Sequence, residues 1–312
     1  MNKKILLIIV TVSLLLAGCS NKVTQTNTAK QNMQSSPSAT TNTNKTAAAA
    51  TITTSDAIDY NQYIKKTWVK KNGSYNTSIC ISNIANGRIT GYLDSGGGGV
   101  HSSYDLQNLT GTINKDTAEC QFSDTIGNKG NIKLVLKPND EIETTIKLTS
   151  KAQAVDQRPQ EGTFDFIPYN LSSIKGFSLI KDQSFMVNLN LWGNVRFVSG
   201  KLTAGNHVPV VFYLTDKEGN ILYDFADAPF PYSVDVKAVS LVDVNKDGLK
   251  DIIIIVADDY KGSDSFGKPI AAVFLQNTKG LFSIDLNLYQ EINTSGNNKD
   301  VKTITNYLSK KF

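Results

Sequence analysis

The chain has 312 residues, 40% of them hydrophobic, so it is long and apolar enough to bury one or two hydrophobic cores. Its formal net charge is +4 at pH 7, and removal of residues 1–18 with Lys3 and Lys4 would lower it to about +2. Proteins that bind nucleic acids usually have a strongly basic surface, so a charge this close to neutral argues against a nucleic-acid partner.

The N-terminal segment has the composition of an export signal. Two lysines precede residues 5–17, which are apolar apart from two hydroxyl side chains. This run is shorter than the about 20 residues that span a bilayer and has the length of a signal-peptide core. Residues 16–19, Leu-Ala-Gly-Cys, resemble the lipobox of bacterial lipoproteins. The resemblance implies a signal peptide at residues 1–18 and lipid attachment, palmitate included, at Cys19.

A lipid anchor would hold the folded part outside the cytoplasm. One acyl chain gives only marginal membrane binding, whereas the two or more chains of the lipoprotein modification anchor a protein stably. Residues 20–54 consist mostly of Ser, Thr, Asn, Gln, Lys and Ala, which bury too little apolar surface to offset the entropy of ordering. We therefore expect residues 19–57 to be the lipidated cysteine and a disordered tether on an extracytoplasmic, membrane-anchored protein.

Residues 58–150 predict short antiparallel strands. Asn72-Gly73 and Asn86-Gly87 are hairpin signals, and several segments around them alternate apolar and polar side chains. About eight strands joined by tight turns favour a small meander, either a barrel or a two-layer sandwich, with Trp68 in its core. The expected strands are residues 63–70, 74–84, 88–93, 100–106, 109–114, 118–123, 131–137 and 141–148.

Two further cysteines fall in this meander. Cys80 and Cys120 form an even pair in an exported protein, a setting that permits a disulfide. Alternation puts Cys120 on the apolar face of its strand and Cys80 on the polar face. Side chains on opposite faces of a sheet are poorly placed to form a disulfide, because the two Cβ atoms must face each other. The sequence leaves open whether Cys80 and Cys120 are bonded.

A second β-rich domain is expected at residues 162–312, after a polar linker at residues 151–161. Residues 252–257 are apolar throughout, which is typical of a central strand covered on both faces. The other expected strands are residues 185–191, 194–198, 208–214, 221–225, 236–242, 270–276 and 281–286.

The C-terminus changes from a strand pattern to a helix pattern. Val301, Ile304 and Leu308 recur at helical spacing, which predicts a packed helix over residues 299–309. Asn297 and Asn298 precede this run and are expected to cap the helix. The whole chain is therefore expected to be mainly β, with an antiparallel meander followed by a second β-rich domain that ends in a helix.

One loop of the second domain carries residues with metal chemistry. Calcium takes six to eight oxygen ligands, which a loop supplies from positions 1, 3, 5 and 9 and from the backbone carbonyl at position 7. Gly248 stands at position 6, where the chain must turn sharply, and Ile254 occupies the position of the bidentate Glu of an EF-hand, so the loop is not an EF-hand. A turn rich in Asp and Asn that binds no ion is the alternative. The expected calcium ligands are Asp243, Asn245, Asp247, the carbonyl of Leu249, and Asp251.

The loop and its flanking strands resemble the calcium loop of FG-GAP/VCBS repeats. The resemblance covers residues 239–255, with residues 271–275 and 280–282 as outer strands of the same repeat. In that family such repeats form the blades of β-propellers, bind calcium and serve adhesion or ligand binding. About 150 residues are too few for a ring of seven blades, so an isolated β-sheet unit is expected.

The sequence contains no motif of a known catalytic site. His101 and His207 lack partners at zinc-ligand spacing, and no nucleophile-elbow, zinc-protease or phosphate-loop motif is present. We therefore expect a non-enzymatic surface module, with one structural calcium, that binds a protein, cell-wall or polysaccharide partner. The alternatives are an extracytoplasmic hydrolase acting on cell wall or polysaccharide, and a small-ligand receptor that uses the barrel of residues 58–150.

Overall fold

The computed structural model describes most of the chain beyond residue 57. The predicted signal peptide, Cys19, the tether, the expected strand at 100–106 and both histidines lie outside the described residues. The residues from Asp56 to Phe312 form one compact unit. Within the described part, no helix combines the length and apolar character needed to cross a bilayer. The described ranges are residues 58–72, 77–94, 108–153, 158–205, 208–225, 228–259, 261–262 and 266–312.

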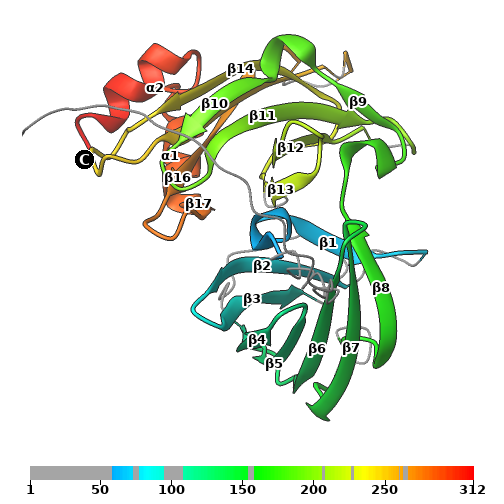
Figure 1. The fold of residues 1–312 in the computed structure, drawn as a ribbon. Coiled ribbons are helices and arrows are strands. Elements are labelled where there is room, and N and C mark those ends of the chain that lie inside the picture. The colour runs from blue at the N-terminus through cyan, green and yellow to red at the C-terminus, as the bar shows by residue number, and fades with distance from the viewer. Residues whose placement is uncertain are drawn as a thin grey trace, which may run out of the picture. The chain divides into compact units, whose positions relative to one another are not determined.

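The first part is a closed antiparallel barrel of eight strands (Figure 1). Each strand pairs with its neighbour in sequence, and β1 pairs with β8 to close the sheet. Closure leaves no edge strand with unpaired backbone groups. The strands are β1 (Thr67–Lys70), β2 (Ser78–Ala85), β3 (Arg88–Asp94), β4 (Leu109–Asn114), β5 (Thr117–Ser123), β6 (Lys129–Lys137), β7 (Glu141–Ser150) and β8 (Gly162–Pro168).

The last barrel strand lies beyond the expected linker. Residues 151–161 connect β7 to β8 within the barrel, so the chain leaves this sheet only after Pro168. The register pairs Trp68 with Pro168, and Phe166 is fully buried in the barrel core. The strand that begins at Gly162 therefore belongs to the barrel, and residue 162 does not begin a separate domain.

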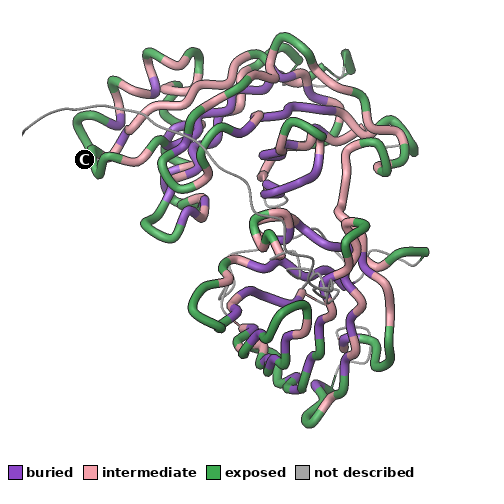
Figure 2. Tube along the Cα trace, in the orientation of Figure 1, coloured by how far each residue is buried: buried purple, intermediate pink, exposed green. Residues whose placement is uncertain are grey.

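Hydrophobic side chains fill the barrel. Trp68 is fully buried, as predicted, and its ring stacks on that of Tyr63 with the centroids 5.9 Å apart. The indole Nε1 of Trp68 donates to the Tyr63 carbonyl oxygen at 3.1 Å, so the polar atom of this core residue has a partner. Figure 2 shows the alternation of buried and exposed residues along the barrel strands.

The second part is a sandwich of two antiparallel sheets. A five-stranded sheet has the order β10-β11-β12-β13, with β9 paired to β11, and a four-stranded sheet has the order β14-β15-β16-β17. One hydrophobic cluster draws residues from both sheets, for example Phe212 and Ile254. The strands are β9 (Phe177–Leu179), β10 (Phe185–Leu189), β11 (Gly193–Leu202), β12 (Val210–Thr215), β13 (Ile221–Asp224), β14 (Val234–Val242), β15 (Asp251–Asp258), β16 (Pro269–Gln276) and β17 (Phe282–Ile284).

Strand β15 lies inside the four-stranded sheet and is covered on both faces. Ile252 and Ile254 belong to the cluster shared by the two sheets, whereas Ile253 and Ile255 pack with the C-terminal helices. An apolar run with no alternation is the pattern of a strand buried on both faces, so the predicted central strand is confirmed.

Two helices, α1 (Leu286–Thr294) and α2 (Val301–Leu308), pack on the four-stranded sheet (Figure 1). The C-terminal helix was predicted, but its N-cap is Asp300, whose side chain accepts from Thr303 N at 2.7 Å, and neither Asn297 nor Asn298. Helix α1 was not predicted. It begins after Asp285, inside the segment expected to be a strand.

Main-chain hydrogen bonds join the barrel to the sandwich through Tyr169, the residue after β8. The Tyr169 N–H donates to the carbonyl oxygen of Thr67 in β1 at 2.8 Å, and the Tyr169 carbonyl accepts from Ile221 N in β13 at 2.7 Å. The neighbouring Asn170 side chain donates to Asn220 Oδ1 at 2.9 Å. The barrel and the five-stranded sheet therefore contact each other directly through one residue of the connection.

Candidate calcium loop and interface pocket

The predicted calcium loop connects β14 to β15 and is held together by its own side chains. Asp243 accepts from the backbone N–H groups of Asp247 and Gly248, at 3.2 and 2.9 Å. Asp247 accepts from Leu249 N at 2.8 Å, and Asn245 Nδ2 donates to its other carboxylate oxygen at 3.0 Å. Gly248 has a φ of +85°, a left-handed conformation that glycine adopts without steric cost.

Asp251, the last predicted ligand, is a fully buried carboxylate. One oxygen accepts from Val244 N at 2.9 Å and the other from Gln276 N at 2.8 Å, which ties the loop to strand β16. Burial raises the pKa of Asp251, and the nearby charges of Asp247 and Asp243 raise it further, while the two N–H donors act in the opposite direction. A nearby cation would relieve this unfavourable negative charge.

The donor set fits calcium in chemistry, but the loop is not arranged as a closed metal cage. Within the described residues, no group of three or more His, Cys, Asp or Glu side chains is placed so that it could hold a metal ion. An ionised carboxylate has about four lone-pair sites, and Asp243, Asp247 and Asp251 each use two of them for the hydrogen bonds above. The lone pairs that remain belong to carboxylate oxygens, which are the ligands that calcium prefers.

The turn between β10 and β11 contacts this loop. Asn190 Nδ2 donates to the carbonyl oxygen of Gly248 at 3.3 Å, and Lys250 Nζ donates to that of Asn188 at 3.1 Å. The next two residues of the turn, Leu191 and Trp192, line a pocket. The same short turn therefore contacts the loop and also lines the pocket.

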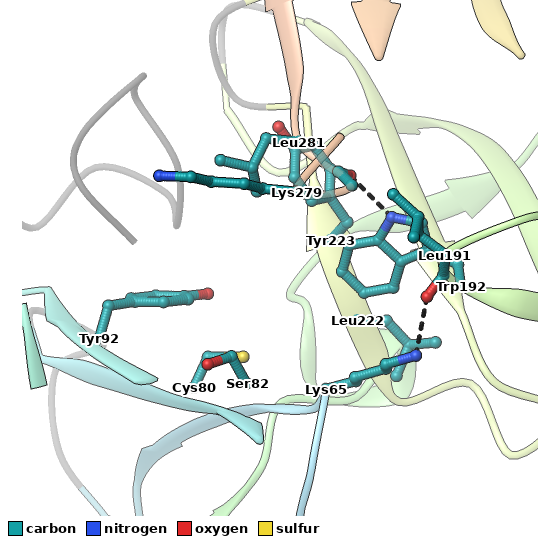
Figure 3. Close-up of a pocket in the computed structure, with 11 residues that line it drawn as sticks. Lys65, Cys80, Ser82, Tyr92, Leu191, Trp192, Leu222, Tyr223, Lys279 and Leu281 are labelled. Carbon is teal, nitrogen blue, oxygen red and sulfur yellow. Dashed lines mark hydrogen bonds between the residues drawn. The ribbon is translucent and has the colours of Figure 1, made fainter. Parts of the chain in front are cut away.

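That pocket, which we call the Trp192 pocket, lies where the barrel meets the sandwich (Figure 3). Tyr92 of β3 and Trp192 enter it from opposite sides, and Lys65 reaches across to donate to the Leu191 carbonyl oxygen at 2.8 Å. The cavity measures ≈ 120 Å³. The lining residues are Lys65, Cys80, Ser82, Tyr92, Leu191, Trp192, Leu222, Tyr223, Lys279, Gly280 and Leu281.

The two cysteines of the barrel do not form the disulfide that the sequence left open. Both are free and buried. Cys120 packs in the barrel core, whereas Cys80 packs with Tyr92 outside that core and lines the Trp192 pocket. Burial raises the pKa of each thiol to about 12, which leaves little of the nucleophilic thiolate at neutral pH. Cys80 is therefore a packing residue of the pocket rather than an activated nucleophile.

No family model, curated protein or solved structure matches the chain. The resemblances to a lipobox and to an FG-GAP/VCBS calcium loop therefore rest on the residues of those two segments alone. They remain predictions, and so do the anchor, the ion and the surface role that follow from them.

The predicted site residues and the pocket residues differ in how far apart they lie in sequence. The loop side chains fall within nine residues of each other, so the sequence alone shows that they belong to one loop. The pocket was not predicted, because Tyr92, Trp192 and Lys279 belong to three distant hairpins. The only local signal was a tryptophan in a turn, where a large apolar side chain needs something to cover it.

Proposed function

We propose that this chain is an exported, lipid-anchored protein whose folded part is a non-enzymatic binding module with one structural calcium. The observation that carries the calcium is the fully buried Asp251 carboxylate, which lies beside Asp243 and Asp247 and has main-chain N–H groups as its hydrogen-bond partners. A divalent cation bound by the loop oxygens would offset this crowded negative charge.

The ion would be held by Asp243, Asn245, Asp247 and Asp251, with the carbonyl of Leu249. Its role is structural, because the loop joins two strands of the sheet that contains the central β15. Calcium would supply charge neutralisation there, and the loop side chains would keep β14, β15 and β16 in register.

A binding role is favoured over a hydrolytic one by the Trp192 pocket. Of the described residues that line it, none is a carboxylate or a histidine, and its one thiol has a pKa raised to about 12. Paired carboxylates or an activated nucleophile are what a hydrolase of cell wall or polysaccharide would need. Its walls are mostly apolar, with aliphatic side chains from Leu191, Leu222 and Leu281.

Calcium is expected to raise the melting temperature of the chain. Extracellular modules bind calcium with dissociation constants of about 10⁻⁴ to 10⁻³ M. Saturation at 100 times that constant would stabilise the fold by about 2.7 kcal/mol, and ordinary millimolar calcium by less than about 1.5 kcal/mol, provided that the unfolded chain does not bind the ion. Scanning calorimetry in EDTA and in excess calcium measures the shift.

Asp247→Ala should abolish the calcium response, because it removes an exposed ligand without opening the core. Asp216→Ala is the matched control, since Asp216 accepts from Asn220 N at 2.8 Å in the β12–β13 turn and lies outside the loop. The control should keep the full shift. Superimposable melting curves of the unmodified chain in EDTA and calcium would show that the loop is only a turn rich in Asp and Asn.

Cys19→Ala is expected to release the protein from the membrane. The lipobox supplies the predicted acyl chains, and a chain without them would lose the free energy of burying their methylenes, about 0.8 kcal/mol each. Fractionation of cells that produce either form measures the distribution. A variant that sediments with membranes as completely as the unmodified chain would contradict the lipid anchor.

A further inference from the structure

The Trp192 pocket has the size of a single ring or a short acyl fragment. Its ≈ 120 Å³ is close to the about 150 Å³ of an engineered apolar cavity that accepts benzene. Leu191, Leu222 and Leu281 supply aliphatic walls, and Trp192 and Tyr223 meet edge to face with their ring centroids 5.7 Å apart. A ligand that fits must have a compact apolar body.

The aromatic walls are fixed by hydrogen bonds to the main chain. Trp192 Nε1 donates to the Gly280 carbonyl oxygen at 2.8 Å, and Tyr223 Oη donates to that of Phe282 at 2.9 Å. A Cβ on Gly280 would lie 3.2 Å from Trp192 Nε1, so the absence of a side chain there lets the indole sit close to the backbone. Walls that are already in place cost a ligand little ordering entropy.

The charged residues of the pocket have one sign. Lys65 and Lys279 line it, and of the described lining residues none is acidic. Lys65 uses one donor on the Leu191 carbonyl and retains two, since an ammonium has three. The exposed Lys279 extends along the pocket in Figure 3. The ligand therefore carries a negative group beside its apolar body.

We propose that the Trp192 pocket binds a small organic anion, namely a single aromatic ring that bears one carboxylate. The ring lies between Trp192 and Tyr92, and the carboxylate pairs with Lys279 or with the free donors of Lys65. This inference names the ligand class of the binding module proposed above and rests on that role. It does not depend on calcium or on the lipid anchor.

Fluorine NMR of para-fluorobenzoate, with the full-length chain in detergent micelles, tests the proposal. Para-fluorobenzamide is the neutral probe of the same shape, and the two are titrated in parallel against detergent alone to subtract partitioning. We expect saturable broadening of the benzoate signal with a dissociation constant on the order of 1 mM, as the few atoms of the probe allow. The benzamide should bind more weakly.

Two variants separate the charge from the cavity. Lys279→Gln should weaken para-fluorobenzoate about two- to fivefold, the range of an exposed ion pair, and leave para-fluorobenzamide unchanged. Leu191→Trp should fill the cavity and abolish saturable binding of both probes, and its melting temperature checks that it folds. Lys217→Gln is the matched control, because Lys217 lies outside the pocket with 86% of its side chain exposed.

The proposal would be overturned by para-fluorobenzoate that shows no saturable binding, or that binds the Leu191→Trp variant as well as the parent. If the two probes bind equally and Lys279→Gln changes neither, the proposal that the ligand carries a carboxylate is overturned. This outcome does not depend on whether Leu191→Trp folds. Either failure leaves the calcium melting shift and the Cys19 fractionation unaffected, so it is distinguishable from failure of those parts of the proposed function.

Discussion

Trp68→Ala is expected to destabilise the chain by about 3–5 kcal/mol, the range for truncation of a buried tryptophan. The side chain is fully buried and stacks on Tyr63, so its removal leaves a cavity inside a closed barrel whose strands cannot easily collapse into it. Because whole domains are stable by about 5–15 kcal/mol, the change would remove a large share of the total.

Urea denaturation followed by circular dichroism measures this effect without relying on tryptophan fluorescence. Met186→Ala is the control, since Met186 lies on β10 with 60% of its surface exposed and should change the free energy of unfolding by less than about 0.5 kcal/mol. A loss below about 1 kcal/mol for Trp68→Ala would mean that Trp68 is not the main packing residue of the barrel.

The strands that were predicted best have their information in adjacent residues. Alternation and hairpin turns located β6 and β7 to within two residues of their observed ends, because side-chain direction in a strand is set by local geometry. The same alternation put Cys80 and Cys120 on opposite faces, as observed. Local pattern therefore carried the strand assignment and the mainly β fold class.

Two elements were missed for different reasons, strand β8 of the barrel and helix α1. Strand β8 pairs with β7 and, about a hundred residues away, with β1, and only the second pairing closes the barrel. The polar, proline-containing segment before it suggested that the barrel had already ended. Helix α1 does carry a local signal, because the capping Asp285 is followed by Leu288 and Ile292 at helical spacing. The preceding strand pattern was extended through that cap, which hid the start of the helix.

The loop and the Trp192 pocket also differ in whether their contacts join neighbouring or distant residues of the sequence. Residues of the β14–β15 loop contact each other through hydrogen bonds that span two to seven positions, so these contacts are local in sequence. The calcium ligands stay a prediction. The link from that loop through Asn190 to the turn that carries Trp192 is a tertiary contact, and nothing in either segment alone indicates it. This link also makes the loop and the pocket neighbours in one structure.

Asp251→Ala should destabilise the chain by about 2–4 kcal/mol in EDTA, before any effect of calcium. The carboxylate accepts from Val244 N and Gln276 N in a buried position, and each orphaned N–H costs about 1–3 kcal/mol. Relief of the repulsion from Asp243 and Asp247, which helps to raise the pKa of Asp251, offsets part of this loss. We expect the hydrogen bonds to outweigh the repulsion because both N–H groups would lose their partners away from water.

Asp251→Asn and Asp247→Ala separate these contributions when unfolding is measured in urea with EDTA. The Asp251→Asn form keeps one acceptor and loses the charge. Its loss in free energy of unfolding should therefore be roughly half of the loss for Asp251→Ala. Asp247→Ala should cost less than about 1 kcal/mol, because Asp247 is exposed and water can bond to Leu249 N in its place. An Asp251→Ala form as stable as the parent in EDTA would mean that charge repulsion cancels both hydrogen bonds. The loop would then depend on a bound cation for all the stability that Asp251 contributes.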